Sequence, residues 1–241
     1  MVRENLERVR ARIAEAARRA GRDPAGVRLL CVTKGVPPPY IEEAIAAGAG
    51  EIGENRVQET QPKRAALAAR HPELRWHLIG HLQRNKVKPA VELFDWIHSV
   101  DSTELVEALG RQVALRQSLP PTRSGAQGER RLELLVQVNI SGEATKHGCR
   151  PEEAEGLAGA ILKKPGLIFS GLMTMPPFSD DPEGSRPFFS ELRRIRDRLQ
   201  EKGMGRPLEL SMGMSRDFEA AVEEGATMVR IGTAIFGART G

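Results

Sequence analysis

The sequence contains few aromatic residues and few cysteines, and both shortages restrict what the chain can be. Only 4% of the 241 residues are aromatic, so a core has to be built mainly from aliphatic side chains. The two cysteines, Cys31 and Cys149, form no Cys-x-x-Cys motif and no framework of pairs. Cys31 lies within an apolar run, which predicts a small buried hydrophobe. Together these features predict a protein of the reducing cytoplasm.

Long apolar runs and one-sided charge are also missing. No stretch approaches the ~20 apolar residues of a membrane span. The first 19 residues are charged and do not resemble a secretory signal. The formal net charge is +4, but the excess arginines alternate with Glu and Asp along the predicted helices. This pattern favours solvated helix faces over a nucleic-acid-binding surface, which would gather basic residues and stacking aromatics.

What the sequence does contain is a regular alternation of strand-like and helix-like segments. Strands are expected at residues 27–33, 51–53, 76–80, 96–100, 132–139, 167–174, 208–212 and 228–232. Helices are expected at residues 2–20, 40–47, 59–69, 85–93, 103–117, 152–162, 188–201 and 216–224. Such alternation implies parallel strands joined by right-handed crossovers.

Eight such units in 241 residues predict the α/β class and a (β/α)₈ TIM barrel, forming one domain over residues 1–241. The N-terminal helix is extra, and we expect it to fill the place in the outer ring that no helix after the eighth strand fills. An open doubly wound sheet is the alternative, but residues 34–39 (Lys-Gly-Val-Pro-Pro-Pro) lack its Gly-rich phosphate turn. Residues 118–130, with two prolines and two glycines, read as an exposed loop.

Polar residues follow the expected strands at the end where barrel enzymes and binding proteins place their chemistry. Lys34 closes the first strand and Asn55 follows the second. A lysine at a strand end often only extends its amine to water. At a barrel mouth it is instead partly desolvated, which makes an amine nucleophilic and able to form a Schiff base with a carbonyl compound.

The loops after the last two strands contain candidate phosphate ligands. Ser211 and Ser215 flank the seventh loop, and Gly232 and Thr233 follow the eighth strand. Hydroxyls and backbone N–H groups at these loops form a recurring phosphate site in barrels. Ser215 has a second interpretation as the N-cap of the helix that follows it.

Arg230 lies inside the last expected strand, where a buried guanidinium needs a partner. That partner is either a group of a ligand in the barrel mouth or an acidic residue such as Glu209 or Asp101.

Three histidines near strands three and four raise the question of a metal site. His77, His81 and His98 have no compact ligand spacing, and by strand alternation only His81 lies near the mouth. We therefore predict no metal ligands.

The motifs of this sequence, taken in their order along the chain, resemble those of the pyridoxal phosphate homeostasis proteins. That family is related to the N-terminal barrel of bacterial alanine racemases. The resemblance covers residues 27–237 and rests on residues 32–34, 53–59, 76–86, 98–101, 138–139, 171–175, 210–217 and 230–237. It implies that Lys34 carries pyridoxal 5′-phosphate (PLP) as a Schiff base. It also implies that Arg230 faces the pyridine nitrogen and that Asn55 lines the pocket. The same resemblance places Ser211, Ser215, Gly232 and Thr233 around the phosphate.

The resemblance further implies a role in intracellular PLP homeostasis, namely binding, buffering and delivering PLP to apoenzymes, without robust turnover. A permanently charged arginine at the ring nitrogen weakens the electron sink that PLP enzymes use. Related racemases also need a tyrosine from a second domain, whereas Tyr40 is the one tyrosine here and no such domain is expected after Gly241. We therefore expect a monomeric carrier. A PLP enzyme acting on an unidentified amino acid, and a barrel binding another phosphorylated metabolite, are the alternatives.

Overall fold

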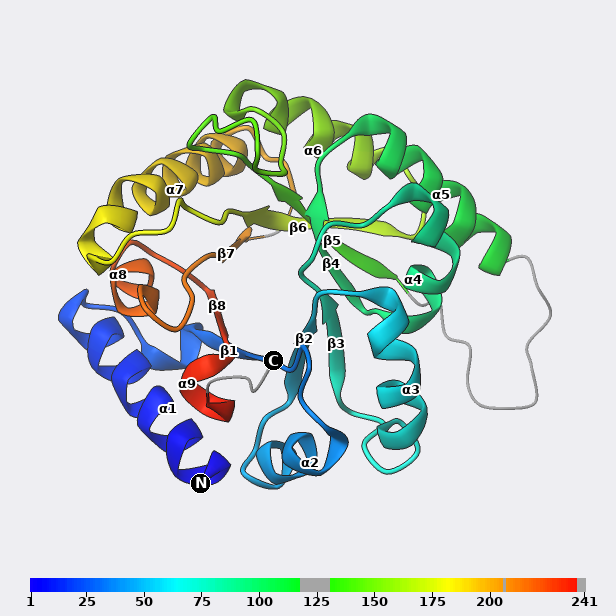
Figure 1. Ribbon diagram of the computed structural model, residues 1–241. Helices are drawn as coiled ribbons and strands as arrows, with labels where there is room; N and C mark the ends of the chain where they lie inside the picture. Colours follow the sequence, from blue (N-terminus) through cyan, green and yellow to red (C-terminus); the bar gives the residue numbers. More distant parts are fainter. Residues whose placement is uncertain (118–130, 206, 238–241) are drawn as a thin grey trace.

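Eight parallel strands form a closed barrel in the order β1 to β8, with β8 paired to β1. The computed structural model describes residues 1–117, 131–205 and 207–237, and Figure 1 shows the helices arranged around the strands. The predicted (β/α)₈ architecture is confirmed, and the open sheet is wrong because the edges of β1 and β8 hydrogen-bond to each other. The loop expected at residues 118–130 lies outside the described residues.

The strands are short, and most agree with the expected positions to within two residues. They are β1 (Arg28–Val32), β2 (Glu51–Glu54), β3 (Arg75–Leu78), β4 (Trp96–Val100), β5 (Leu132–Gln137), β6 (Leu167–Met173), β7 (Glu209–Ser211) and β8 (Met228–Ile231). Several expected strands continue too far at their C-terminal ends. There the chain leaves the ladder to enter the loops that surround the barrel mouth.

A helix follows every strand in the described part of the chain. The helices are α1 (Val2–Arg19), α2 (Pro38–Ala46), α3 (Val57–Leu67), α4 (Val87–Leu93), α5 (Thr103–Gln117), α6 (Ala154–Leu162), α7 (Arg186–Glu201), α8 (Phe218–Glu223) and α9 (Thr233–Phe236). Since α9 has only four residues, α1 packs against α8, α9 and α2 and completes the ring (Figure 1). The expected role of the N-terminal helix is thus confirmed.

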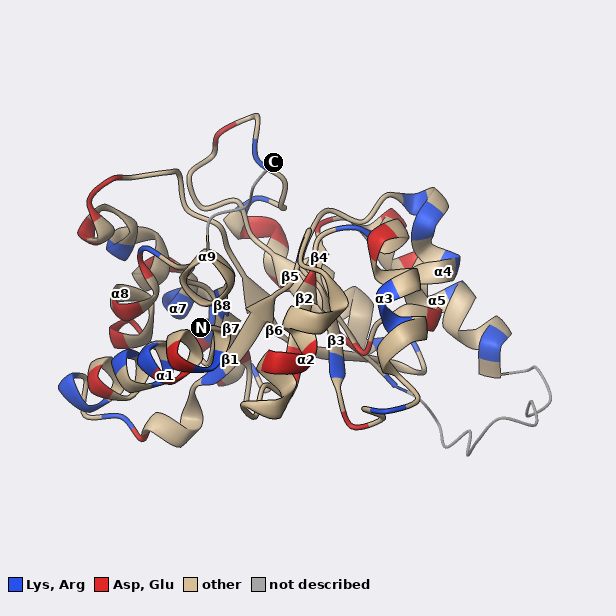
Figure 2. Cartoon of the chain, turned by 60° about the horizontal axis from the view of Figure 1, so that its bottom comes forward, with Lys and Arg blue, Asp and Glu red and all other residues tan. Residues whose placement is uncertain are grey.

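Most of the apolar core lies between the strands and the helices. Charged residues of both signs are interspersed along the outer helices (Figure 2), where Arg12 pairs with Glu219 and Arg19 with Glu223. This agrees with solvated helix faces. No helix within the described residues is both long and apolar enough to cross a membrane.

The interior of the barrel is filled differently, because its apolar cluster is small. Trp96, Leu135, Met173 and Met228 form a separate buried group. The fully buried His77 and His98 lie beside Trp96, with the His77 ring stacked on the indole at 5.5 Å between centroids. The barrel interior therefore contains polar groups that need hydrogen-bond partners.

Candidate functional site

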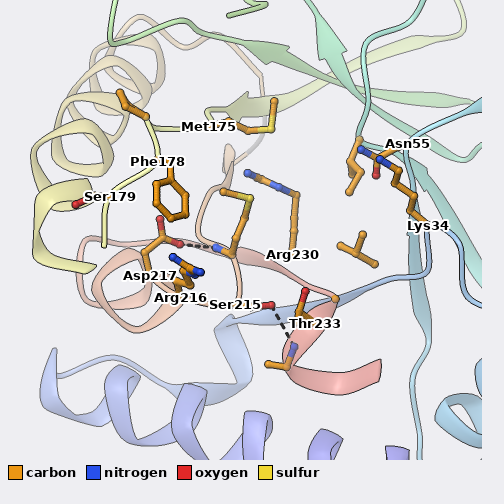
Figure 3. A pocket seen from close by; sticks show the side chains of 16 residues that line it. Lys34, Asn55, Met175, Phe178, Ser179, Ser215, Arg216, Asp217, Arg230 and Thr233 are labelled. Atoms are coloured by element: carbon orange, nitrogen blue, oxygen red, sulfur yellow. Dashed lines mark hydrogen bonds between the residues drawn. The ribbon is translucent and has the colours of Figure 1, made fainter. Parts of the chain in front are cut away.

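A cavity of about 580 Å³ opens at the C-terminal ends of the strands. This volume lies in the range of small-molecule and cofactor sites. Six of the seven predicted site residues line it: Lys34, Asn55, Ser215, Arg230, Gly232 and Thr233. Figure 3 labels all of these except Gly232 and shows how their side chains lie around the space. The barrel closure brings them together from both ends of the sequence.

Lys34 and Asn55 come from the ends of the neighbouring strands β1 and β2 and lie on the same side of the cavity (Figure 3). Lys34 is half-buried, and its amine makes no hydrogen bond or ion pair with the described residues. The backbone of Asn55 is fixed from behind by Gly80, where an added Cβ would lie 2.2 Å from the Asn55 carbonyl oxygen. The lysine amine is therefore available to a ligand in the cavity.

The loop after β7 and the start of α9 form the hydroxyl-bearing side. Ser215 Oγ accepts the backbone N–H of Ala234 at 3.4 Å, which joins this loop to the turn of Gly232 and Thr233. The alternative prediction that Ser215 caps the following helix is wrong. Asp217 occupies the N-cap position of α8, and its Oδ1 accepts the backbone N–H of Met214 at 2.7 Å.

Gly213 gives this loop its shape. Its φ of +90° is a conformation that favours glycine, and a Cβ there would lie 2.5 Å from the Cβ of Ala221. The loop can therefore turn tightly against α8 and leave Ser215 facing the cavity.

Arg230 is the most deeply buried cation of the cavity, with 3% of its surface exposed. Its Nη1 donates to Ser211 Oγ at 2.7 Å and its Nη2 donates to the Thr174 carbonyl at 2.9 Å. Burial lowers the pKa of the guanidinium to about 10, against the opposing effect of Asp217, so the group remains charged at neutral pH.

The acidic partners suggested for Arg230 are wrong. Glu209 pairs with Arg28 at 3.2 Å, and Asp101 lies 3.4 Å from His81. Arg230 thus has two neutral acceptors and no carboxylate in contact among the described residues. The carboxylate that acts on its charge from a distance, Asp217, lines the same cavity.

The placement of Ser211 also corrects an expectation. Ser211 is not among the residues that line the cavity; its side chain is fully buried below Arg230. The hydroxyl is bonded to Arg230 at 2.7 Å and to His98 Nδ1 at 2.9 Å. Since both partners occupy it, Ser211 does not fit the predicted contact with a phosphate.

Sequence reasoning missed the apolar wall of the cavity, to which Met175, Pro177 and Phe178 contribute from the loop after β6. Phe178 is 71% exposed, and the Arg216 guanidinium lies 4.6 Å from its ring centroid (Figure 3). An exposed aromatic in a chain with so few aromatics was the available signal. Its loop position gave no periodic pattern from which to place it.

The histidines separate into two groups. His77 and His98 are buried in the barrel with His77 Nδ1 2.9 Å from His98 Nε2, and burial lowers both pKa values well below the usual range. His81 is near the mouth, as expected, where it stacks on His147 at 4.0 Å and approaches Asp101. These last three do not line the cavity. The expectation that no metal is bound stays a prediction.

Comparison with known proteins places this geometry in context. Residues 5–240 match the family model described as alanine racemase, N-terminal domain. The pyridoxal phosphate homeostasis protein of Pseudomonas aeruginosa is 45% identical over 238 residues, covering 99% of this chain and 96% of that protein.

Solved structures agree with the sequence match. The structure of PipY from Synechococcus elongatus PCC7942 with PLP bound has a TM-score of 0.82 and 36% identity, covering 98% of this chain and 100% of that one. Alanine racemase from Corynebacterium glutamicum has a TM-score of 0.67 at 18% identity, with 97% of this chain and 62% of the racemase covered. The racemase likeness concerns the fold alone.

Proposed function

Since the chain belongs to the family of pyridoxal phosphate homeostasis proteins, we propose that it binds PLP as a Schiff base on Lys34 and serves to buffer and deliver it. The cavity is the observation that supports this most. It combines a half-buried amine free of described partners, a buried guanidinium and a hydroxyl-bearing turn. An aldehyde, a pyridine ring and a phosphate are the chemical groups that such a set would bind.

Each side of the cavity has a distinct role in this proposal. Lys34 would hold the aldehyde carbon of PLP through a C=N bond, formed with the release of one water molecule. Arg230 would lie toward the ring nitrogen, and Asn55 would support the ring beside the lysine. Ser215, Gly232 and Thr233 bind the phosphate through the Ser and Thr hydroxyls and backbone N–H groups. PLP itself supplies an electron sink, which a charged Arg230 at the ring nitrogen weakens.

We propose a carrier rather than an enzyme, because no tyrosine is among the described residues that line the cavity, and its one carboxylate in that lining, Asp217, accepts the backbone N–H of Met214 at 2.7 Å. Tyr40, the one tyrosine of the chain, is 48% exposed on α2 and is not among the residues lining the cavity. A monomer in the cytoplasm that transfers PLP to apoenzymes fits this role. Steady turnover of any amino acid that is lost in Lys34→Ala would contradict it in favour of a PLP enzyme.

The test is an absorbance spectrum of the protein incubated with PLP, comparing wild type with Lys34→Ala. Wild type should develop a yellow band that Lys34→Ala lacks. After borohydride reduction, peptide mass analysis should find the phosphopyridoxyl group on Lys34. The matched control is Lys163→Ala, because Lys163 is an exposed lysine outside the cavity and its loss should leave the spectrum unchanged.

Two results would disprove the proposal in different ways. A wild type that remains colourless with excess PLP would exclude the covalent site and favour a noncovalent phosphorylated ligand. If Lys34→Ala remained yellow and the phosphopyridoxyl group were found on another lysine, that lysine and not Lys34 would form the Schiff base.

A further inference from the structure

A continuous line of polar side chains crosses the barrel interior from its floor to the cavity. Glu51 stands at the start of β2, and the fully buried His77, His98 and Ser211 lie between it and Arg230. Arg230 Nη1 lies 2.7 Å from Ser211 Oγ, and Ser211 Oγ lies 2.9 Å from His98 Nδ1. His98 Nε2 lies 2.9 Å from His77 Nδ1. Each of these five side chains comes from a different strand: Glu51 from β2, His77 from β3, His98 from β4, Ser211 from β7 and Arg230 from β8.

The two ends of this line together favour one order of donors and acceptors. A guanidinium can only donate, so Ser211 Oγ accepts from Arg230, and its own hydroxyl hydrogen can go to His98 Nδ1. His98 is then protonated at Nε2 and donates to His77 Nδ1. His77 is in turn protonated at Nε2, which is directed to Glu51 Oε2 at 3.6 Å. The reverse order, in which Ser211 accepts from both Arg230 and His98, would leave an unprotonated His77 Nε2 facing the Glu51 carboxylate.

The unsatisfied atoms at the far end support this order. Among buried side-chain atoms of the described residues, His77 Nε2 and Glu51 Oε2 are two that lack a hydrogen-bond partner. They face each other, as a donor and a carboxylate acceptor should. The line is therefore a directional chain of neutral groups between a guanidinium and a carboxylate, which itself binds Arg28 at 2.7 Å through its other oxygen.

We propose that His98 and His77 are positioning residues for Arg230, acting through Ser211 to hold the guanidinium toward the cavity and so set the environment of the PLP ring nitrogen. This role rests on the proposed function. An arginine side chain has many rotamers, and fixing one requires bonds on more than one side. Here the Thr174 carbonyl holds one Nη and the histidine chain holds the other.

The experiment compares two serine variants that lose the same atom. Ser211 and Ser99 are both fully buried. Unlike Ser211, Ser99 Oγ has no hydrogen-bond partner among the described residues, so it is not part of the hydrogen-bonded line from Arg230 to His77. Ser211→Ala should weaken PLP binding about tenfold, since it leaves the guanidinium without one of its two acceptors. Ser99→Ala should bind PLP within about twofold of wild type. Absorbance titration measures both values.

Replacing the histidine separates positioning from packing. His98→Leu should resemble Ser211→Ala, whereas His98→Gln should retain much of the wild-type affinity because an amide can both accept and donate. In Ser211→Ala and His98→Leu, the pH titration of the bound cofactor's absorbance should move to higher pH. A guanidinium that is less well held near the ring nitrogen opposes its protonation less.

A double-mutant cycle decides whether the chain acts through Arg230. In an Arg230→Met background, Ser211→Ala should cause no further loss of PLP affinity. An undiminished loss in that background would overturn the proposal, as would folded Ser211→Ala and His98→Leu proteins with wild-type affinity and pH profile. A wild type that takes up no PLP would overturn the proposed function first, which is a separate outcome.

Discussion

Two arginines inside the same barrel differ in how their charge is compensated. Arg28, at the start of β1 on the floor, is bonded to Glu51 at 2.7 Å and to Glu209 at 3.2 Å and covers the Trp96 ring. Arg230, near the end of β8, has only a hydroxyl and a carbonyl as acceptors. The floor therefore resembles a structural ion-pair network. Among the described residues, the mouth retains a cation without a carboxylate in contact, as expected where a ligand completes the site.

The largest expected effect comes from changing each arginine to methionine. Arg28→Met leaves two partly buried carboxylates without their cation, so the free energy of unfolding of the apoprotein should fall by about 2 kcal/mol. Arg230→Met removes a desolvated charge that has no carboxylate in contact, so stability should stay within about 1 kcal/mol of wild type. Urea denaturation of both variants measures the difference.

PLP affinity should respond in the opposite way. Arg230→Met should bind PLP about tenfold more weakly or worse, while Arg28→Met, if folded, should stay close to wild type. If Arg230→Met lost stability as Arg28→Met does and kept its PLP affinity, the distinction between floor and mouth would be wrong.

An intermediate effect is expected from the histidines that connect the two ends. Folding holds His77 and His98 neutral because burial, with Arg28, Arg75 and Arg230 nearby, lowers both pKa values. The unfolded chain takes up protons below pH about 6.5, so their contribution to stability is present above that pH and is lost as the pH falls. The loss should approach about 1.4 kcal/mol per pH unit for each histidine.

The variant His98→Gln tests this by removing one titrating group. Between pH 6.5 and pH 5, its free energy of unfolding should fall less steeply than that of wild type. The slopes should differ by up to about 1.4 kcal/mol per pH unit, the value for one proton. Ser99→Ala, on the same strand, should retain the wild-type slope. Equal slopes in all three proteins would mean that the buried histidines do not carry this pH dependence.

The smallest effect is expected at the hydroxyl-bearing side of the mouth. Ser215 Oγ holds only the long 3.4 Å bond to Ala234, so Ser215→Ala should change stability by less than about 0.5 kcal/mol. PLP binding should weaken about fivefold to tenfold, because the hydroxyl is proposed to bond a charged phosphate. Pyridoxal, which lacks the phosphate, should bind wild type and variant equally. Equal losses for both ligands would place Ser215 away from the phosphate.

Much of this could be predicted from the sequence because the relevant signals are local. Strand and helix periods gave the barrel, and the rule that chemistry collects at strand ends selected Lys34, Asn55, Ser215, Gly232 and Thr233, all of which line the cavity. Ser211 was selected by the same rule and is misplaced, because β7 is only three residues long. Its last residue still belongs to the barrel wall, paired with Met228.

Other features depend on register, which no local pattern encodes. His98 and Ser211 are 113 residues apart in the chain and meet inside the barrel at 2.9 Å. One of the two alternatives for Arg230, an acidic partner such as Glu209, is wrong because the barrel brings Glu209 to Arg28.

The sequence by itself determined the alternation of strands and helices, and with it the end of the barrel where Lys34 and its neighbours lie. Only the tertiary structure decided which inward-facing side chains touch, and hence that one arginine is paired and the other exposes its charge to a cavity. The physical reason is that side-chain period and strand order are properties of the chain. The stagger of eight strands around a closed barrel is a property of their packing against one another.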